Sequence, residues 1–130
     1  MRRSMRRLHT TMRVPEHVLK VLKRYAADHD RTTGAVIAMA LKEWADAQEF
    51  PGIDYRYTPS GRRPHVLGTG LTVREMHMIW RDYGKKWPRI KKAFPHLTWA
   101  QVQAAVAYGR VYPNEVTPFE VPVGLPVVRV

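Results

Sequence analysis

The segment LHTTMRV, from Leu8 to Val14, limits how this chain can fold more than any other feature of the sequence. Its side chains alternate in character, which predicts a short β-strand. One face of this strand would carry Thr10, Met12 and Val14, and the other would carry His9, Thr11 and Arg13. Its backbone needs a hydrogen-bonding partner, because ordering each residue costs roughly 1–2 kcal/mol. The next strand pattern begins only at Ile53, so we expect the partner to be the same strand of a second copy.

Two helical patterns follow this strand. Pro15 suits a first helical turn, and the residues after it form a short amphipathic helix. Thr32 is a good N-cap for a second helix, predicted from Thr33 to Ala47. The apolar stripe of the first helix consists of Val18, Leu22, Tyr25 and Ala26, and that of the second consists of Ile37, Ala40, Leu41 and Trp44.

The charge of the chain is concentrated in two basic regions. The formal net charge is +11; residues 1–15 hold five arginines and no acid, and residues 51–95 hold ten bases and three acids. Such regions suit a polyanion, most often nucleic acid, because each neutralised phosphate releases counterions. A merely solvated basic surface is the alternative. In the arm formed by residues 1–7, the expected phosphate contacts are Arg2, Arg3, Arg6 and Arg7.

A second unit is predicted from residue 51 to residue 113, with two short strands followed by helices. Ile53, Tyr55 and Tyr57 alternate before a Pro-Ser-Gly turn, and a short apolar segment follows at His65–Leu67. Two capping-box patterns, Thr72 with Glu75 and Thr98 with Gln101, precede helices, and Gly84 suits the end of the first. A short basic helix, Trp87 to Phe94, lies between them. Helix, short helix, turn and helix is a helix-turn-helix order.

Two further segments are candidate binding surfaces. The short basic helix and its approach could contact DNA or a partner through Lys85, Lys86, Arg89, Lys91 and Lys92. Trp87 and Phe94 could stack nucleotides there, but with Ile90 they have the spacing of a core stripe. Residues 114–130 form an extended Pro-rich tail, which either binds a toxin or folds back on its own unit. Its candidate toxin-binding residues are Phe119, Val121, Val123, Leu125, Val127 and Val128.

Residues 8–50 resemble the ribbon-helix-helix DNA-binding domains of the CopG, Arc and MetJ kind, in a strand ending in Pro-Glu and a Thr-capped second helix. The resemblance implies a dimer that exchanges strands and lays the resulting ribbon in the major groove. His9, Thr11 and Arg13 would then read base edges. Arginine pairs with guanine and threonine suits thymine, which agrees with this role. Thr32 and Thr33 would direct backbone N–H groups at a phosphate, although simple capping explains them equally well.

The second unit, from about Ile53 to Pro113, resembles an antitoxin-type helix-turn-helix domain of unknown function, as found in VapB-like antitoxins. The matching positions are Gly61, Arg63, Pro64, Val66, Leu67, Gly68, Thr69, Leu71, Thr72, Val73, Phe94, Pro95, Leu97, Thr98, Val102, Ala104, Ala105, Ala107 and Tyr108. The chain departs from that pattern in its longer, more basic link at residues 84–92 and in Gly70. The resemblance implies a partner toxin of the PIN-domain ribonuclease kind.

The sequence therefore predicts a mainly α protein, a swapped-strand ribbon-helix-helix dimer with a small helix-turn-helix domain and short strands. We expect an antitoxin that binds operator DNA as a dimer or higher even oligomer and neutralises a toxin. The alternatives are a stand-alone transcriptional or plasmid-partition regulator and an RNA-binding accessory protein. We expect no enzymatic activity, cofactor or metal site, because no credible acid–base pair, nucleophile motif or ligand spacing is present. The absence of cysteine and of a long apolar run fits a cytoplasmic protein without a membrane span.

Overall fold

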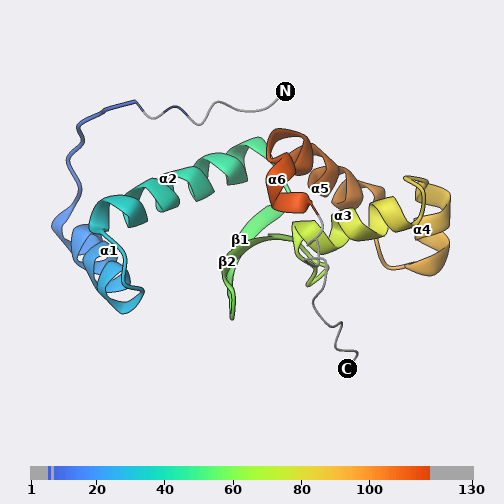
Figure 1. Ribbon diagram of the computed structural model, residues 1–130, viewed down its shortest axis with the longest axis horizontal. Helices are drawn as coiled ribbons and strands as arrows, with labels where there is room; N and C mark the ends of the chain where they lie inside the picture. Colours follow the sequence, from blue (N-terminus) through green and yellow to red (C-terminus); the bar gives the residue numbers. More distant parts are fainter. Residues whose placement is uncertain (1–5, 7, 118–130) are drawn as a thin grey trace, which may run out of the picture.

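The computed structural model describes residue 6 and residues 8–117 of the chain, and they form a mainly helical protein with one two-stranded antiparallel sheet (Figure 1). The elements in chain order are α1 (Glu16–Asp28), α2 (Thr33–Glu49), β1 (Ile53–Thr58), β2 (Gly61–Val66), α3 (Val73–Asp82), α4 (Trp87–Ala93), α5 (Trp99–Val111) and α6 (Pro113–Val116). The helices α1 to α5 and β1 fall where the sequence predicts them, whereas β2 begins at Gly61, ahead of the predicted segment His65–Leu67, because the turn ends there. The additional short helix α6 includes residues 114–116, so the prediction that the extended tail begins at residue 114 is wrong there.

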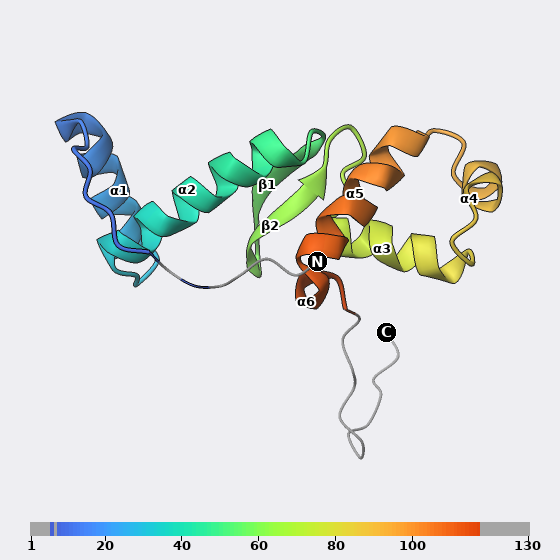
Figure 2. The ribbon, with the colours of Figure 1, turned by 90° about the horizontal axis from the view of Figure 1, so that it is seen from above.

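The helix pair α1–α2 extends away from the rest of the described chain (Figures 1 and 2). The Thr32 side chain caps α2 as predicted, accepting a hydrogen bond from the Ala35 N–H at 3.1 Å. At the end of α1 the ring of His29 stacks on that of Tyr25, with centroids 3.9 Å apart. The second half of α2 packs on the hairpin, and the His29 ring also lies edge-to-face on that of Tyr57 in β1, with centroids 5.6 Å apart.

Helix α2 buries a different face from the one predicted. Val36, Asp46 and Phe50 at its end are buried within the single chain. In the predicted stripe, Leu41 is 49% exposed and Trp44 is 67% exposed. Apolar residues thus occupy two faces of α2, and the hairpin covers the other one. The stripe is expected to pack in the shared core of a dimer, which a single chain does not test.

The hydrophobic core lies in the C-terminal part of the molecule. The hairpin pairs Ile53 with Val66 at one end and Thr58 with Gly61 at its turn. Both predicted capping boxes are confirmed, at the starts of α3 and α5. The fully buried side chains of this core come from α3, α4, α5 and the loop before α5; they are Val73, Met76, Ile90, Leu97, Val102, Ala105 and Tyr108.

A buried polar network joins α2 to this core. Asp46 is 1% exposed, and its carboxylate accepts hydrogen bonds from Lys42 at 2.9 Å, Tyr55 at 2.7 Å and Tyr112 at 2.7 Å. Burial acts to raise the pKa of Asp46, but these three donors outweigh it and hold the pKa below its ordinary value of 3.8. The carboxylate is therefore a charged anchor for groups from α2, β1 and the end of α5.

The network continues through two tyrosine hydroxyls. The hydroxyl of Tyr55 lies 2.6 Å from that of Tyr108, which in turn donates to Glu115 at 2.8 Å. Burial raises the pKa of both tyrosines well above the ordinary value, so both hydroxyls keep their protons. Satisfied polar chains of this kind fix one geometry, because breaking any link leaves a buried polar group without its partner.

Candidate nucleic-acid interface

The N-terminal segment holds the predicted base-reading residues. His9, Thr11 and Arg13 are exposed, and residues 8–15 have no regular secondary structure in the single chain. The predicted strand from Leu8 to Val14 is therefore not formed here. A strand needs backbone hydrogen-bond partners on a neighbouring strand, and this segment has none within the described part of a single chain.

Six large apolar side chains on this segment and the helix pair are exposed in the described chain. We call this set the open apolar face; it consists of Leu8, Met12, Val18, Val21, Leu41 and Trp44, with exposures of 38–77%. Between residues 8 and 49 the only buried hydrophobic side chains are Ala26 and Val36. This region therefore buries too little apolar surface to be stable alone.

The residues predicted to contact phosphate differ in exposure and in the bonds that their side chains already make. Thr32 is exposed and its hydroxyl is engaged as the N-cap of α2, so the capping role is confirmed. Thr33 begins α2 and is partly buried, and Arg6 is exposed. The remaining predicted contacts, Arg2, Arg3 and Arg7, lie outside the described residues. The same is true of the six candidate toxin-binding residues of the tail, Phe119, Val121, Val123, Leu125, Val127 and Val128.

The basic residues around α4 divide into two groups. Lys91 donates to the backbone carbonyls of Pro95, at 2.7 Å, and Leu97, at 3.4 Å, so its ammonium group holds the turn that follows α4. The other four, Lys85, Lys86, Arg89 and Lys92, are exposed. The aromatic side chains of this region pack inward: Ile90 is fully buried, while Trp87 and Phe94 are partly buried against the core.

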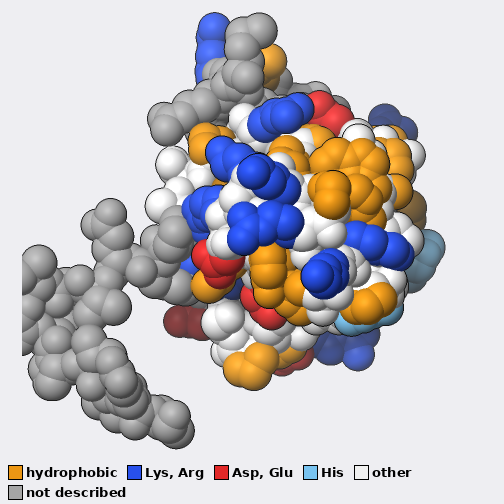
Figure 3. Space-filling view, turned by 90° about the vertical axis from the view of Figure 1, so that its right-hand side faces the viewer, with side chains coloured by type: hydrophobic (Ala, Val, Ile, Leu, Met, Phe, Trp, Pro, Cys, Tyr) orange, Lys and Arg blue, Asp and Glu red, His pale blue; other side chains and the backbone are white. Residues whose placement is uncertain are grey.

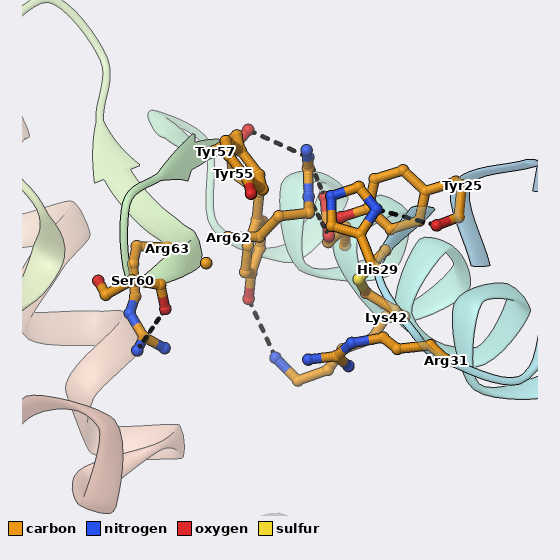
Figure 4. A pocket seen from close by; sticks show the side chains of 12 residues that line it. Tyr25, His29, Arg31, Lys42, Tyr55, Tyr57, Ser60, Arg62 and Arg63 are labelled. Atoms are coloured by element: carbon orange, nitrogen blue, oxygen red, sulfur yellow. Dashed lines mark hydrogen bonds and ion pairs between the residues drawn. The ribbon is translucent and has the colours of Figure 1, made fainter. Parts of the chain in front are cut away.

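A polar pocket of about 440 Å³ lies between the helix pair and the tip of the hairpin (Figure 4). Four cationic side chains line it, Arg31, Lys42, Arg62 and Arg63. Arg62 forms a bidentate pair with Glu43, through Nε at 2.7 Å and through its terminal nitrogen at 2.5 Å. Lys42 bonds Asp46, and Arg63 bonds the carbonyl of Ser60 at 3.1 Å. Most of these cations are already bonded to acidic side chains or to a backbone carbonyl. We call this set of polar contacts between α2 and the hairpin the joint.

Sequence reasoning missed the residues of this joint. Asp46 was not singled out, although it lies seven residues after Met39 and shares a face of α2 with Val36 and Glu43. An acid in line with buried apolar residues is a signal for a buried, hydrogen-bonded carboxylate. Its donors Tyr55 and Tyr112 come from remote parts of the chain, so no local sequence pattern predicts their hydrogen bonds to Asp46.

No helix in the described part of the chain is both long and apolar enough to cross a membrane. No group of three His, Asp or Glu side chains among residues 6 and 8–117 is placed to hold a metal ion.

Comparison of the chain with protein-family models, with curated proteins and with solved structures gives no significant match.

Proposed function

We propose that this protein is a homodimeric, site-specific DNA-binding protein whose N-terminal segments pair across the two-fold axis as a ribbon. The observation that carries the proposal is the open apolar face, which includes Leu8 and Met12 on the segment itself and Trp44 on α2. A second copy supplies both things that this region lacks, a backbone partner for residues 8–14 and a cover for the apolar side chains. The alternating pattern then places Met12 inward and Arg13 outward.

The outward face of such a ribbon has the chemistry to read bases. The major groove is about 12 Å wide and admits a two-stranded ribbon. Arg13 can bond the O6 and N7 atoms of guanine together, and Thr11 offers a hydroxyl and a methyl group. Each residue is presented twice in a symmetric dimer, so the expected operator is palindromic. The basic arm at residues 1–7 would add phosphate contacts on either side.

Dimerisation through the open apolar face is tested with Trp44→Glu. A charged side chain at the centre of a dimer core is not tolerated, so the variant should sediment as a monomer and lose operator binding. The matched control is Leu67→Glu, which introduces the same charge at a side chain that is 45% exposed but lies after the hairpin. A dimeric Trp44→Glu variant that still binds the operator would rule out this interface.

Base reading by Arg13 is tested with Arg13→Ala on two DNA duplexes, the operator and a scrambled sequence. We expect a loss of about 1–3 kcal/mol on the operator and little change on the scrambled duplex. An equal loss on both duplexes would mean that Arg13 contacts only phosphate.

The antitoxin role rests on the resemblance of the second unit to VapB-like domains, and we extend the proposal to it on that ground. A toxin of the PIN-domain ribonuclease kind would be bound by this unit and by the tail. Truncation after Thr117 is the appropriate test, because Val116 is buried in the core and must be kept. The truncated chain should bind the operator and fail to neutralise the toxin encoded beside it. Full neutralisation would show that the tail is not needed for toxin binding. Absence of any co-purifying toxin would favour a stand-alone regulator.

A further inference from the structure

The end of the molecule formed by α4 presents a cluster of exposed cations that the proposed ribbon does not use. We call Lys85, Lys86, Arg89 and Lys92 the α4 basic surface. Figure 3 looks onto this end and shows Lys and Arg side chains gathered on one face. Between residues 81 and 92 the sequence holds six bases and a single acid, Asp82, so this end is strongly positive.

These four cations are not used to hold the fold together. Lys20, Lys42, Arg56 and Arg62 form ion pairs, whereas no member of the α4 basic surface takes part in one within the described residues. Their neighbour Lys91 is the contrast, because its ammonium group bonds two backbone carbonyls. Unpaired like charges held close together repel one another, which raises the free energy of the folded chain. A bound polyanion would neutralise these charges and remove the repulsion.

Lys85 adds a second, independent observation. It has a φ of 60°, directly after Gly84 with a φ of 67°, and this left-handed pair turns the chain from α3 into α4. Its N–H donates to the carbonyl of Trp80 at 2.7 Å, which fixes the turn. Glycine is the residue that suits such a φ, and lysine is strained there. Strained backbone positions cluster at functional sites, and here the strain falls on a member of the α4 basic surface.

The aromatic side chains decide which nucleic acid this surface fits. A single-stranded ligand needs exposed rings on which bases stack. Here Trp87 packs on Trp99 with centroids 5.7 Å apart, and Phe94 packs edge-to-face on Tyr83, also at 5.7 Å. Trp87, Phe94 and Tyr83 are partly buried by these ring contacts, while Trp99 is 38% exposed. One partly open ring beside four exposed cations suits the phosphate backbone of a duplex better than a series of stacked bases.

We propose that the α4 basic surface is a second DNA-binding site, which contacts the phosphate backbone of duplex DNA beyond the segment contacted by the ribbon. The contacts are electrostatic and independent of base sequence. This inference rests on the proposed DNA-binding function, and it extends the footprint of each chain to its C-terminal unit.

The test uses the full chain with Lys85→Gln, Lys86→Gln and Arg89→Gln combined. Affinity for the operator within a long duplex should fall at least about tenfold at 0.1 M salt, and the slope of log affinity against log salt should flatten by about 0.9 for each phosphate that is no longer neutralised. A shorter duplex that contains only the operator should bind both proteins nearly equally. The control combines Lys20→Gln, Lys23→Gln and Arg24→Gln, which remove the same charge from the exposed face of α1.

Three outcomes would overturn the inference. Equal losses in the two triple variants would mean that only net charge matters, and an unchanged salt dependence would mean that α4 does not contact DNA. A larger loss for single-stranded RNA than for duplex DNA would assign the surface to RNA. In each case the ribbon proposal stands as long as the wild-type chain binds the operator and Arg13→Ala weakens that binding. If the wild-type chain binds no duplex, both proposals fail.

Lys85→Gly separates this role from a structural one. Glycine relieves the left-handed strain, so the midpoint of thermal unfolding should rise, while affinity for the long duplex should fall because one cation is removed. A variant that is more stable and binds as tightly as the wild type would show that Lys85 does not contact DNA.

Discussion

At Gly109, helix α5 has no room for a side chain. A Cβ atom there would overlap Nε2 of His77 on α3 and would lie 3.1 Å from a methyl group of Val116. The His77 ring donates from Nε2 to the carbonyl of Ala105 at 2.7 Å. Burial lowers the pKa of His77, as do the positive charges of Arg81 and Lys85, so the ring stays neutral at pH 7. Close contact between α3 and α5 therefore depends on the absence of a side chain at Gly109.

We expect Gly109→Ala to lower the free energy of unfolding by roughly 2–4 kcal/mol, because it crowds the helix contact and displaces the hydrogen bond of His77. Gly34→Ala is the matched control, since nothing lies within 4 Å of its Cβ position. Inside α2 that change should raise stability by about 0.5–1 kcal/mol. Chemical denaturation of the three proteins measures both effects, and a neutral Gly109→Ala variant would contradict the close helix contact.

Helix α2 is the element that uses two faces. Val36 and Asp46 are buried against the same chain, whereas Leu41 and Trp44 are exposed. The sequence predicted the extent of this helix and its Thr32 cap from local chemistry, because spacing and capping residues are local signals. It did not predict which face the chain itself would bury, since that depends on where the hairpin lies. The capping boxes of α3 and α5 were predictable for the same local reason.

The anchor at Asp46 gives the element-scale prediction. Asp46→Asn should lower the free energy of unfolding by about 3 kcal/mol, because it removes the charge that three donors satisfy and turns an acceptor into a donor. Asp54→Asn should change it by less than about 0.5 kcal/mol, since that carboxylate is exposed beside Arg56. Urea unfolding of both variants measures the difference.

The pH dependence of the same anchor has a defined sign. The pKa of Asp46 is lowered in the folded chain, so its contribution to stability is present above about pH 4 and is lost as the pH falls towards the folded pKa. Below pH 4 the wild-type chain should therefore lose stability more steeply than Asp46→Asn. Parallel curves for the two proteins would show that Asp46 is not held ionised by its donors.

The whole molecule has an unequal distribution of buried surface. The core lies after Phe50, while the N-terminal helix pair leaves its apolar face open. The order of the helices and of the hairpin between them was predictable from the sequence. The polar network was not, because it brings Asp46 and Tyr55 together with Tyr108 and Glu115 from the end of the fold.

If a second copy covers the open face, stability depends on protein concentration. Raising the concentration a hundredfold favours the folded dimer by about 2.7 kcal/mol, so the midpoint of thermal unfolding should rise by several degrees. Trp44→Glu should unfold at a temperature that does not change with concentration. Calorimetry at two concentrations checks this, and an unchanged midpoint for the wild type would argue against a dimer that assembles on folding.

The carboxylate of Asp46 also has a consequence for DNA geometry. Because it binds groups on both sides of the joint, the C-terminal unit cannot swing about α2 without leaving a buried charge unsatisfied. In the proposed complex, the ribbon and the α4 basic surface would then be held at one separation and one angular phase. DNA turns once in about 10–10.5 base pairs, so an insertion of half a turn beside the operator would carry the flanking phosphates to the far side of the duplex. A rigid joint of this kind would make the proposed complex sensitive to the helical phase of its DNA.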